Sequence, residues 1–261
     1  RIYLFPIHQA RRGIRGKLPP SMEQTTVKQA SMATILLFLP GFRKPQKHDT
    51  HRFVMGYLQL IASAFKAPLT TVENFAREAE EINSALELKL GGRRLWAISK
   101  HERVALYCVT RLLNPRFAVE TGVGAGVSTT FILSGLESGV LHSFDLGAKY
   151  GDEQQAYPVG FIIPEELKKK WVLHVGDSKK LLGPFFDSLK DEKIQLFLHD
   201  GEHTYTNVHS ELTLAWTHMD RGAILIDNCD WTQAPEEFAK RLNTPLTHLV
   251  DDMCMMLKAW R

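Results

Sequence analysis

Cysteine is scarce in this chain of 261 residues, which contains only Cys108, Cys229 and Cys254. An odd count without a C-x-x-C pair argues against a secreted disulfide scaffold and against a structural zinc site, and it favours the reducing cytoplasm. Long hydrophobic runs are also missing: the longest, residues 32–39, is too short to span a bilayer and lacks a signal-peptide cleavage site. A large charge excess is absent too, since the formal net charge of +3 favours neither nucleic acid nor a membrane surface as a partner.

The first 67 residues are irregular, because prolines and glycines punctuate them heavily. We expect this region to be an N-terminal helical appendage that packs on the main domain or on a second subunit. Residues 68–261 are expected to form that main domain. Apolar segments near the N-terminus are compatible with a homodimer. The interrupting residues are Gly13, Gly16, Pro19, Pro20, Pro40, Gly41 and Pro45.

From residue 70 onward the pattern becomes regular. Apolar residues at spacings of three and four predict a helix over 70–90, and a second helix fits 100–113. Short apolar strands then alternate with helices, which predicts a doubly wound α/β domain whose parallel sheet is covered on both faces. The tail predicts an antiparallel hairpin of two further strands, 246–251 and 254–259. The other expected strands are 117–120, 140–145, 171–175, 194–199 and 223–227, and the expected helices are 127–136, 165–170, 178–189, 205–219 and 235–242.

Three glycines, Gly122, Gly124 and Gly126, lie between the first of these strands and the next helix. Glycine permits positive φ and a close approach of the backbone to a ligand, and the N–H groups of the helix N-terminus point at that ligand. The G-x-G-x-G spacing differs from the G-x-G-x-x-G of dinucleotide-binding folds, and Glu120 precedes it by two residues. The pattern resembles motif I of class I S-adenosylmethionine (SAM) methyltransferases. An acid at this position can balance the positive charge of SAM, directly or through water.

Acidic residues end the later strands, where ligands of open α/β sheets bind. Asp145 ends the second strand, about 20 residues after Gly122, the distance at which an acid takes ribose hydroxyls in nucleoside-binding folds. Asp177 follows the third strand and either lies near the adenine or caps the helix that begins at Ser178, and both interpretations are open. Ser178 itself either caps that helix or touches the adenine edge.

A second group of polar residues follows the fourth and fifth strands. Asp200 ends the fourth strand, and Asp227 and Asn228 end the fifth. Neighbouring strand ends bring these residues together, and two carboxylates with an amide oxygen are hard ligands suited to Mg²⁺, Mn²⁺ or Ca²⁺. The alternative is that Asp227 and Asn228 merely shape a turn. His203 can face the cleft as a general base with a pKa near neutrality, whereas His199 is expected to be a satisfied core histidine.

The stretch from about Leu95 to Trp231 resembles the small-molecule SAM methyltransferases of the Methyltransferase 24 family, to which sugar O-methyltransferases of macrolide biosynthesis are related. The resemblance rests on V-E-T-G-V-G-A-G-V-S-T from residue 119, V-G-D-S from 175, H-D-G-E-H-T-Y from 199 and L-I-D-N from 225. It implies a Rossmann-like sheet of seven strands in the order 3-2-1-4-5-7-6 with the last strand antiparallel, and a substrate lid in the N-terminal region. Asp200, Asp227 and Asn228 also resemble the metal triad of catechol and caffeoyl-CoA O-methyltransferases. The implied cofactor-binding residues are Glu120, Gly122, Gly124, Gly126, Ser128, Asp145, Asp177 and Ser178.

These observations predict a SAM-dependent methyltransferase that uses SAM and Mg²⁺ or another divalent cation. The expected acceptor is a hydroxyl group of a small molecule such as a sugar, a phenol or a natural product. His203 is preferred over Asp200 as the base, because a tight metal ligand does not easily act as a base. An NAD-dependent oxidoreductase is one alternative, against which the glycine spacing argues, and a non-catalytic SAM-binding protein is another, against which the convergent acids argue. A nucleic-acid acceptor is not expected, because the fourth strand ends in H-D-G-E rather than an N/D-P-P-Y/F motif.

Overall fold

The computed structural model describes residues 47–92, 95–147, 149–150 and 157–259. The described residues from 49 onward form one compact unit. Helix α2 (Lys47–Phe65) contributes Tyr57 and Ile61 to the core of this unit. Most of the predicted appendage lies outside the described residues, so its boundary at residue 67 and its role as a lid or a dimer contact stay predictions. Among the described residues, no helix combines the length and the apolar composition that a bilayer span needs.

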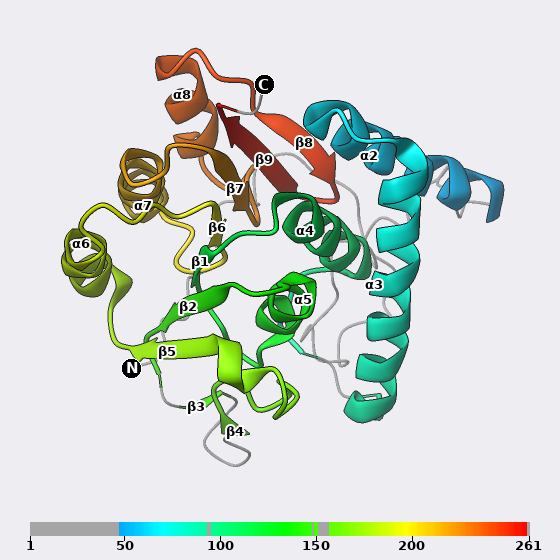
Figure 1. Ribbon diagram of the computed structural model, residues 1–261, viewed down its shortest axis with the longest axis horizontal. Coiled ribbons are helices and arrows are strands. Elements are labelled where there is room, and N and C mark those ends of the chain that lie inside the picture. The colour runs from blue at the N-terminus through cyan, green and yellow to red at the C-terminus, as the bar shows by residue number, and fades with distance from the viewer. Residues whose placement is uncertain (1–46, 93–94, 148, 151–156, 260–261) are drawn as a thin grey trace, which may run out of the picture. The chain divides into compact units, whose positions relative to one another are not determined.

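Within the described residues, the main sheet has seven strands (Figure 1). Their order is β5-β2-β1-β6-β7-β9-β8. The pairs from β5 to β7 are parallel, and β9 is antiparallel to both of its neighbours. Counted as the seven predicted strands, this order is 3-2-1-4-5-7-6, so the predicted topology is confirmed. The strands are β1 (Phe117–Thr121), β2 (Val140–Asp145), β5 (Trp171–Val175), β6 (Leu196–His199), β7 (Gly222–Ile226), β8 (Thr247–Val250) and β9 (Met253–Lys258).

Helices cover both faces of the sheet, as predicted (Figure 1). Helices α3, α4 and α5 lie on one face, and α6, α7 and α8 lie on the other. A capping box starts α4: the hydroxyl of Ser99 accepts from the N–H of Glu102, and the carboxylate of Glu102 accepts from the N–H of Ser99. The helices are α3 (Leu69–Leu90), α4 (Lys100–Leu113), α5 (Val127–Gly135), α6 (Ser178–Ser188), α7 (Tyr205–Thr217) and α8 (Ala234–Arg241).

The helix expected over 165–170 is wrong. Only a 3₁₀ turn, η2 (Lys168–Lys170), forms there, because six residues lie between Pro164 and β5, and segments this short commonly form 3₁₀ turns as connectors. The ammonium group of Lys170 donates to the carbonyl oxygens of Leu133 (2.8 Å) and Leu136 (2.6 Å), which satisfies groups that the end of α5 leaves free. The two-residue strands β3 (Lys149–Tyr150) and β4 (Tyr157–Pro158) were not predicted, because so short a strand shows no periodicity.

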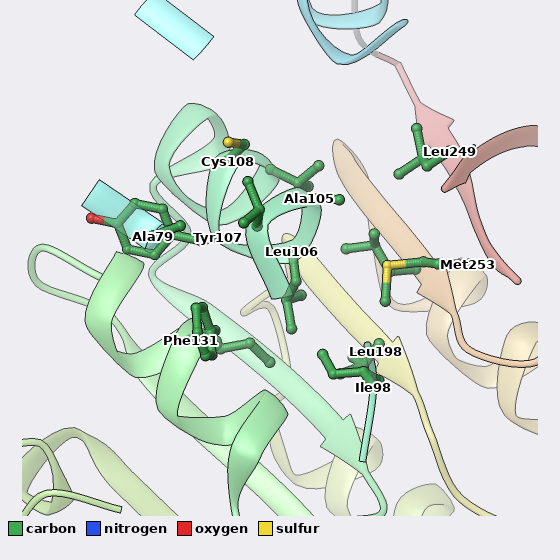
Figure 2. Close-up of a cluster of buried hydrophobic side chains, with 14 of the residues drawn as sticks. Ala79, Ile98, Ala105, Leu106, Tyr107, Cys108, Phe131, Leu198, Leu249 and Met253 are labelled. Atoms are coloured by element: carbon green, nitrogen blue, oxygen red, sulfur yellow. The ribbon is translucent and has the colours of Figure 1, made fainter. Parts of the chain in front are cut away.

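Alternate residues of the central strands enter two different hydrophobic clusters. In β6, Leu196 and Leu198 join the cluster beneath α3, α4 and α5, whereas Phe197 joins the cluster beneath α6, α7 and α8. Figure 2 shows the first cluster, with Leu106 of α4 and Phe131 of α5 on the same side of the sheet as Leu198. Burial on both faces explains the continuous apolar runs of these strands. Polar side chains are left for the strand ends, where the candidate site lies.

Candidate cofactor and metal site

The loop between β1 and α5 contains glycines because side chains do not fit there. Gly122, Gly124 and Gly126 have φ values of 82°, 51° and 95°, in the left-handed region that favours glycine. A Cβ atom on Gly122 would collide with the carbonyl group of Asp200, and one on Gly126 would lie 2.6 Å from Cγ1 of Ile163. The loop therefore lies directly against the end of β6, at the carboxyl edge of the sheet.

Asp145 holds this loop from the end of β2. Its Oδ2 accepts hydrogen bonds from the backbone N–H groups of Val123 (2.9 Å) and Gly124 (3.0 Å), and its Oδ1 accepts from the N–H of Gly147 at 2.9 Å. Asp145 is thus an anchor of the glycine loop. A carboxylate offers about four lone-pair sites, so these bonds leave capacity for another donor. The predicted contact of Asp145 with ribose hydroxyls stays a prediction.

Glu120 lies beneath the loop and has no exposed surface. Its carboxylate accepts hydrogen bonds from the hydroxyls of Ser128 (2.6 Å), Thr129 (2.8 Å) and Ser143 (2.7 Å). Burial raises the pKa of Glu120 to about 7, although the three hydroxyls act in the opposite direction. Glu120 therefore organises the start of α5, and its predicted part in balancing the charge of the cofactor stays a prediction. Ser128, predicted to bind the cofactor, is itself buried and directs its hydroxyl to Glu120.

A cavity of about 290 Å³ opens beside the glycine loop. Four of the predicted cofactor residues line it: Gly122, Asp145, Asp177 and Ser178. Asp177 is also the N-cap of α6, because its carboxylate accepts from the N–H of Lys179 at 3.0 Å. The capping interpretation of Asp177 is therefore confirmed, and the residue borders the cavity as well.

A larger hollow, of about 660 Å³, lies at the opposite edge of the sheet. Gln195 and Asp220, which line it, precede strands β6 and β7. Open α/β sheets bind their ligands outside the carboxyl ends of the strands. The smaller cavity, at that end, is therefore the candidate cofactor site.

Glu211, on α7, links the elements around this cavity, and sequence reasoning missed it. Its Oε2 faces Nδ1 of His199 at 2.7 Å and accepts from the hydroxyl of Thr121 at 2.7 Å. Its Oε1 accepts from the hydroxyl of Ser178 (2.6 Å) and from Nδ2 of Asn207 (3.0 Å). Burial acts to raise the pKa of Glu211, but these hydrogen bonds and the charge of His199 outweigh it and lower that pKa. The sequence signal that could have identified Glu211 is its position as an acid on the buried face of the helix predicted over 205–219.

Asp200 and Asp227 lie together where β6 and β7 end. Oxygen atoms of both carboxylates and a ring nitrogen of His203 lie within 4.8 Å of one another. Burial raises the pKa of Asp200 well above its usual value, and the negative charge of Asp227 adds to the effect. Burial also raises the pKa of Asp227, to about 6. The two carboxyl groups therefore share a proton when no cation neutralises them.

A second set of acids adjoins this pair. Carboxylate oxygens of Glu102, Asp227 and Asp252 also lie within 4.8 Å of one another. Burial raises the pKa of Glu102 to about 8, and its side-chain hydrogen bond with Asp252 and the charge of Asp227 act in the same direction. Nδ2 of Asn228 donates to Oδ2 of Asp252 at 2.7 Å. The structure thus places His203 beside the two aspartates. Asn228 as a metal ligand, through its amide oxygen, stays a prediction.

His203 differs from the expectation in its pKa. Burial lowers that pKa to about 4, and the nearby His199 adds to the effect, so the imidazole is neutral at neutral pH. Nδ1 of His203 and Nε2 of His199 are buried, and neither has a hydrogen-bond partner among the residues that the structure describes. The two rings are perpendicular, with centroids 5.1 Å apart, and the ring of Trp231 lies 5.4 Å from that of His203. His199, expected to be satisfied, is satisfied at one nitrogen only.

Comparisons with known proteins agree with this geometry. A family model described as a methyltransferase domain matches residues 119–229. A methyltransferase from Geobacter sulfurreducens is 15% identical, with a TM-score of 0.52 over 68% of this chain and 88% of its own. The calicheamicin methyltransferase CalS11 is 17% identical, with a TM-score of 0.50 over 84% and 95%. No curated protein matches the chain in sequence. At these identities, the two solved structures show a common fold.

Proposed function

We propose that this chain is a SAM-dependent methyltransferase, because a methyltransferase-domain model matches residues 119–229 and the chain has a fold in common with a solved methyltransferase. We propose further that it methylates a hydroxyl oxygen of a small molecule with the help of a divalent cation. The observation that carries the proposal is the meeting of Asp200, Asp227 and His203 at the strand ends next to the glycine loop. Hard carboxylate ligands beside a cofactor cavity suit an acceptor that binds through oxygen.

The residues present fit both a divalent cation and a nucleoside cofactor. Two carboxyl groups with raised pKa values form a donor set for Mg²⁺ or Mn²⁺. His203, whose buried Nδ1 has no hydrogen-bond partner among the described residues, lies beside them and remains available as a base. Three glycines with positive φ and the cavity beside them suit a nucleoside cofactor. SAM supplies a methyl group on a sulfonium centre, and a divalent cation supplies a Lewis acid that lowers the pKa of the acceptor hydroxyl.

The chain's own residues would orient the cofactor, hold the cation and deprotonate the acceptor hydroxyl. Asp145 fixes the glycine loop, and Asp177 and Ser178 border the cavity where the cofactor would lie. Asp200 and Asp227 would hold the cation, and the neutral imidazole of His203 would accept the proton of the acceptor hydroxyl. Because His203 is a weak base, the proposal requires the pKa of the acceptor to be lowered at the site.

Metal dependence is tested first with the purified full chain and radiolabelled SAM against a panel of phenols and sugars. We expect turnover to fall in EDTA and to return with Mg²⁺. Asp227→Asn should raise the Mg²⁺ concentration for half-maximal turnover at least about tenfold, or ~1.4 kcal/mol. Asp230→Asn, an exposed residue of the same loop, is the matched control and should leave it unchanged. Unchanged turnover in EDTA would remove the cation from the proposal.

The role of His203 is tested by His203→Ala. The expected result is a loss of kcat with unaltered binding of S-adenosylhomocysteine, measured by calorimetry, because His203 acts on the acceptor and not on the cofactor. Near-normal kcat would exclude His203 as the base.

A cytoplasmic location, a homodimer and the absence of a nucleic-acid or membrane partner remain part of this proposal.

A further inference from the structure

The C-terminal hairpin carries three soft donor side chains that the proposed methyl transfer does not use. Cys229 follows β7, Cys254 lies on β9 and His248 lies on β8, and β9 runs between the other two strands (Figure 1). Cys254 pairs with Ile226 on one side and with His248 on the other. Directly opposite residues of an antiparallel pair point to the same face of the sheet. The hairpin therefore places Cys254 and His248 on one face, and Cys229, 25 residues before Cys254, joins them from the end of β7.

The distances make this group a ligand set. Donor atoms of Cys229, His248 and Cys254 lie within 4.8 Å of one another. Nδ1 of His248 is 3.2 Å from Sγ of Cys254 and 3.9 Å from Sγ of Cys229. The two cysteines are paired as a disulfide, with their Cα atoms 6.0 Å apart. A disulfide does not require a third donor, so an imidazole nitrogen within 4 Å of both sulfur atoms is the feature that calls for an explanation.

We propose that Cys229, Cys254 and His248 form a binding site for a soft divalent cation such as Zn²⁺, and that the disulfide closes it. Two thiolates and an imidazole are the donors that zinc prefers, and three protein ligands leave one tetrahedral position for water. Both cysteines are buried, whereas His248 is exposed, which gives the site a route to solvent. The absence of a C-x-x-C pair argued against zinc from the sequence, but here the ligands come from three segments.

The chemistry balances with a dithiol as the reductant. The S–S bond accepts two electrons and two protons from the dithiol, which leaves as its own disulfide, and two cysteine thiols form. Binding of Zn²⁺ then releases the two thiol protons to solvent, while Nδ1 of His248 donates its lone pair. Oxidation by a disulfide reverses the sequence and expels the metal. The inference does not depend on methyl transfer, and the hard acids at Asp200 and Asp227 constitute a separate site.

The test uses the full chain, reduced with dithiothreitol and then freed of it without oxygen. Cobalt(II) is the probe, because thiolate ligands give it a charge-transfer absorption in the near ultraviolet that carboxylates do not. We expect one equivalent of cobalt(II) to produce this band and one equivalent of zinc to abolish it. The oxidised chain should give no band. His248→Ala should weaken cobalt binding at least about tenfold, or ~1.4 kcal/mol, and Cys254→Ala should remove the band.

Cys108→Ala is the matched control, because Cys108 is a buried thiol of α4 in the first core cluster (Figure 2) and should not alter the band. Circular dichroism at each step shows whether a variant has folded. The proposal is overturned if the folded, reduced chain gives no thiolate band, if the band survives in Cys254→Ala, or if His248→Ala binds cobalt like the unaltered chain. It is equally overturned if the oxidised chain gives the same band as the reduced one.

Discussion

Replacing Glu102 by Gln is expected to remove a pH-dependent loss of stability from the metal-free protein. Glu102 is 2% exposed, and its carboxyl group lies beside those of Asp227 and Asp252. In the folded chain its pKa is raised from 4.5 to about 8, chiefly by burial. The folded state therefore binds this proton more tightly than the unfolded state. The resulting stabilisation is complete below pH 4.5 and is lost as the pH rises through 8.

The magnitude follows from that difference in pKa. At about 1.4 kcal/mol per pH unit, it corresponds to at most roughly 4–5 kcal/mol. Because the neighbouring acids share the protons, we expect about half of this, ~2 kcal/mol. Gln keeps the capping box, since its carbonyl oxygen can accept from the N–H of Ser99. Glu102→Gln should therefore match the unaltered chain at pH 5 and exceed its free energy of unfolding by ~2 kcal/mol at pH 8.5.

Urea unfolding followed by circular dichroism, in EDTA and between pH 5 and 9, measures this effect. Glu236→Gln is the control, because Glu236 also lies in the first turn of a helix but is exposed. It should show the same pH dependence as the unaltered chain. If the curves of Glu102→Gln and the unaltered chain run parallel across the whole range, the carboxyl group of Glu102 does not hold a proton and the reasoning is refuted.

Three further substitutions test the site. Gly122→Ala should abolish binding of S-adenosylhomocysteine in calorimetry, because its Cβ would collide with the carbonyl group of Asp200; retained affinity would contradict the close approach. Glu211→Gln should lower the free energy of unfolding by about 1–3 kcal/mol, measured in urea, because the new amide nitrogen would face buried donors such as His199. An unchanged urea midpoint would refute the role of Glu211 in linking the elements around the cavity. Trp231→Ala should raise KM for the acceptor and leave the affinity for the cofactor unchanged, because the exposed ring stands beside the candidate base; a change confined to the cofactor would count against this assignment.

The sheet was predictable from the sequence because strands that are buried on both faces have continuous runs of apolar residues. Phe197 and its neighbours Leu196 and Leu198 serve opposite clusters, so the strand reads as an apolar run whatever its register. The turn at 168–170 was not predictable in this way. The strand from Trp171 was predicted, but the six residues of helical composition before it do not show whether an α-helix or a single 3₁₀ turn forms.

The candidate site was predictable where a residue directly ends a strand. Asp145, Asp200 and Asp227 occupy such positions, and the parallel sheet places their backbones at one edge. Glu102 and Asp252 were missed because they reach Asp227 from the start of α4 and from the turn before β9. That approach depends on the insertion of β9 next to β7, a long-range pairing that no short motif records. The same pairing of β9 with β7 brings Cys254, on β9, next to Cys229, which follows β7.

The acids at this edge indicate why the site suits a cation. Among the ion pairs of the described residues, none joins a lysine or arginine to Asp200, Asp227, Glu102 or Asp252. Burial raises the pKa values of Glu102, Asp200 and Asp227, and repulsion between neighbouring carboxylates adds to the effect for Glu102 and Asp200, so protonation is favoured in the metal-free chain. A divalent cation would replace those protons and add direct bonds to oxygen.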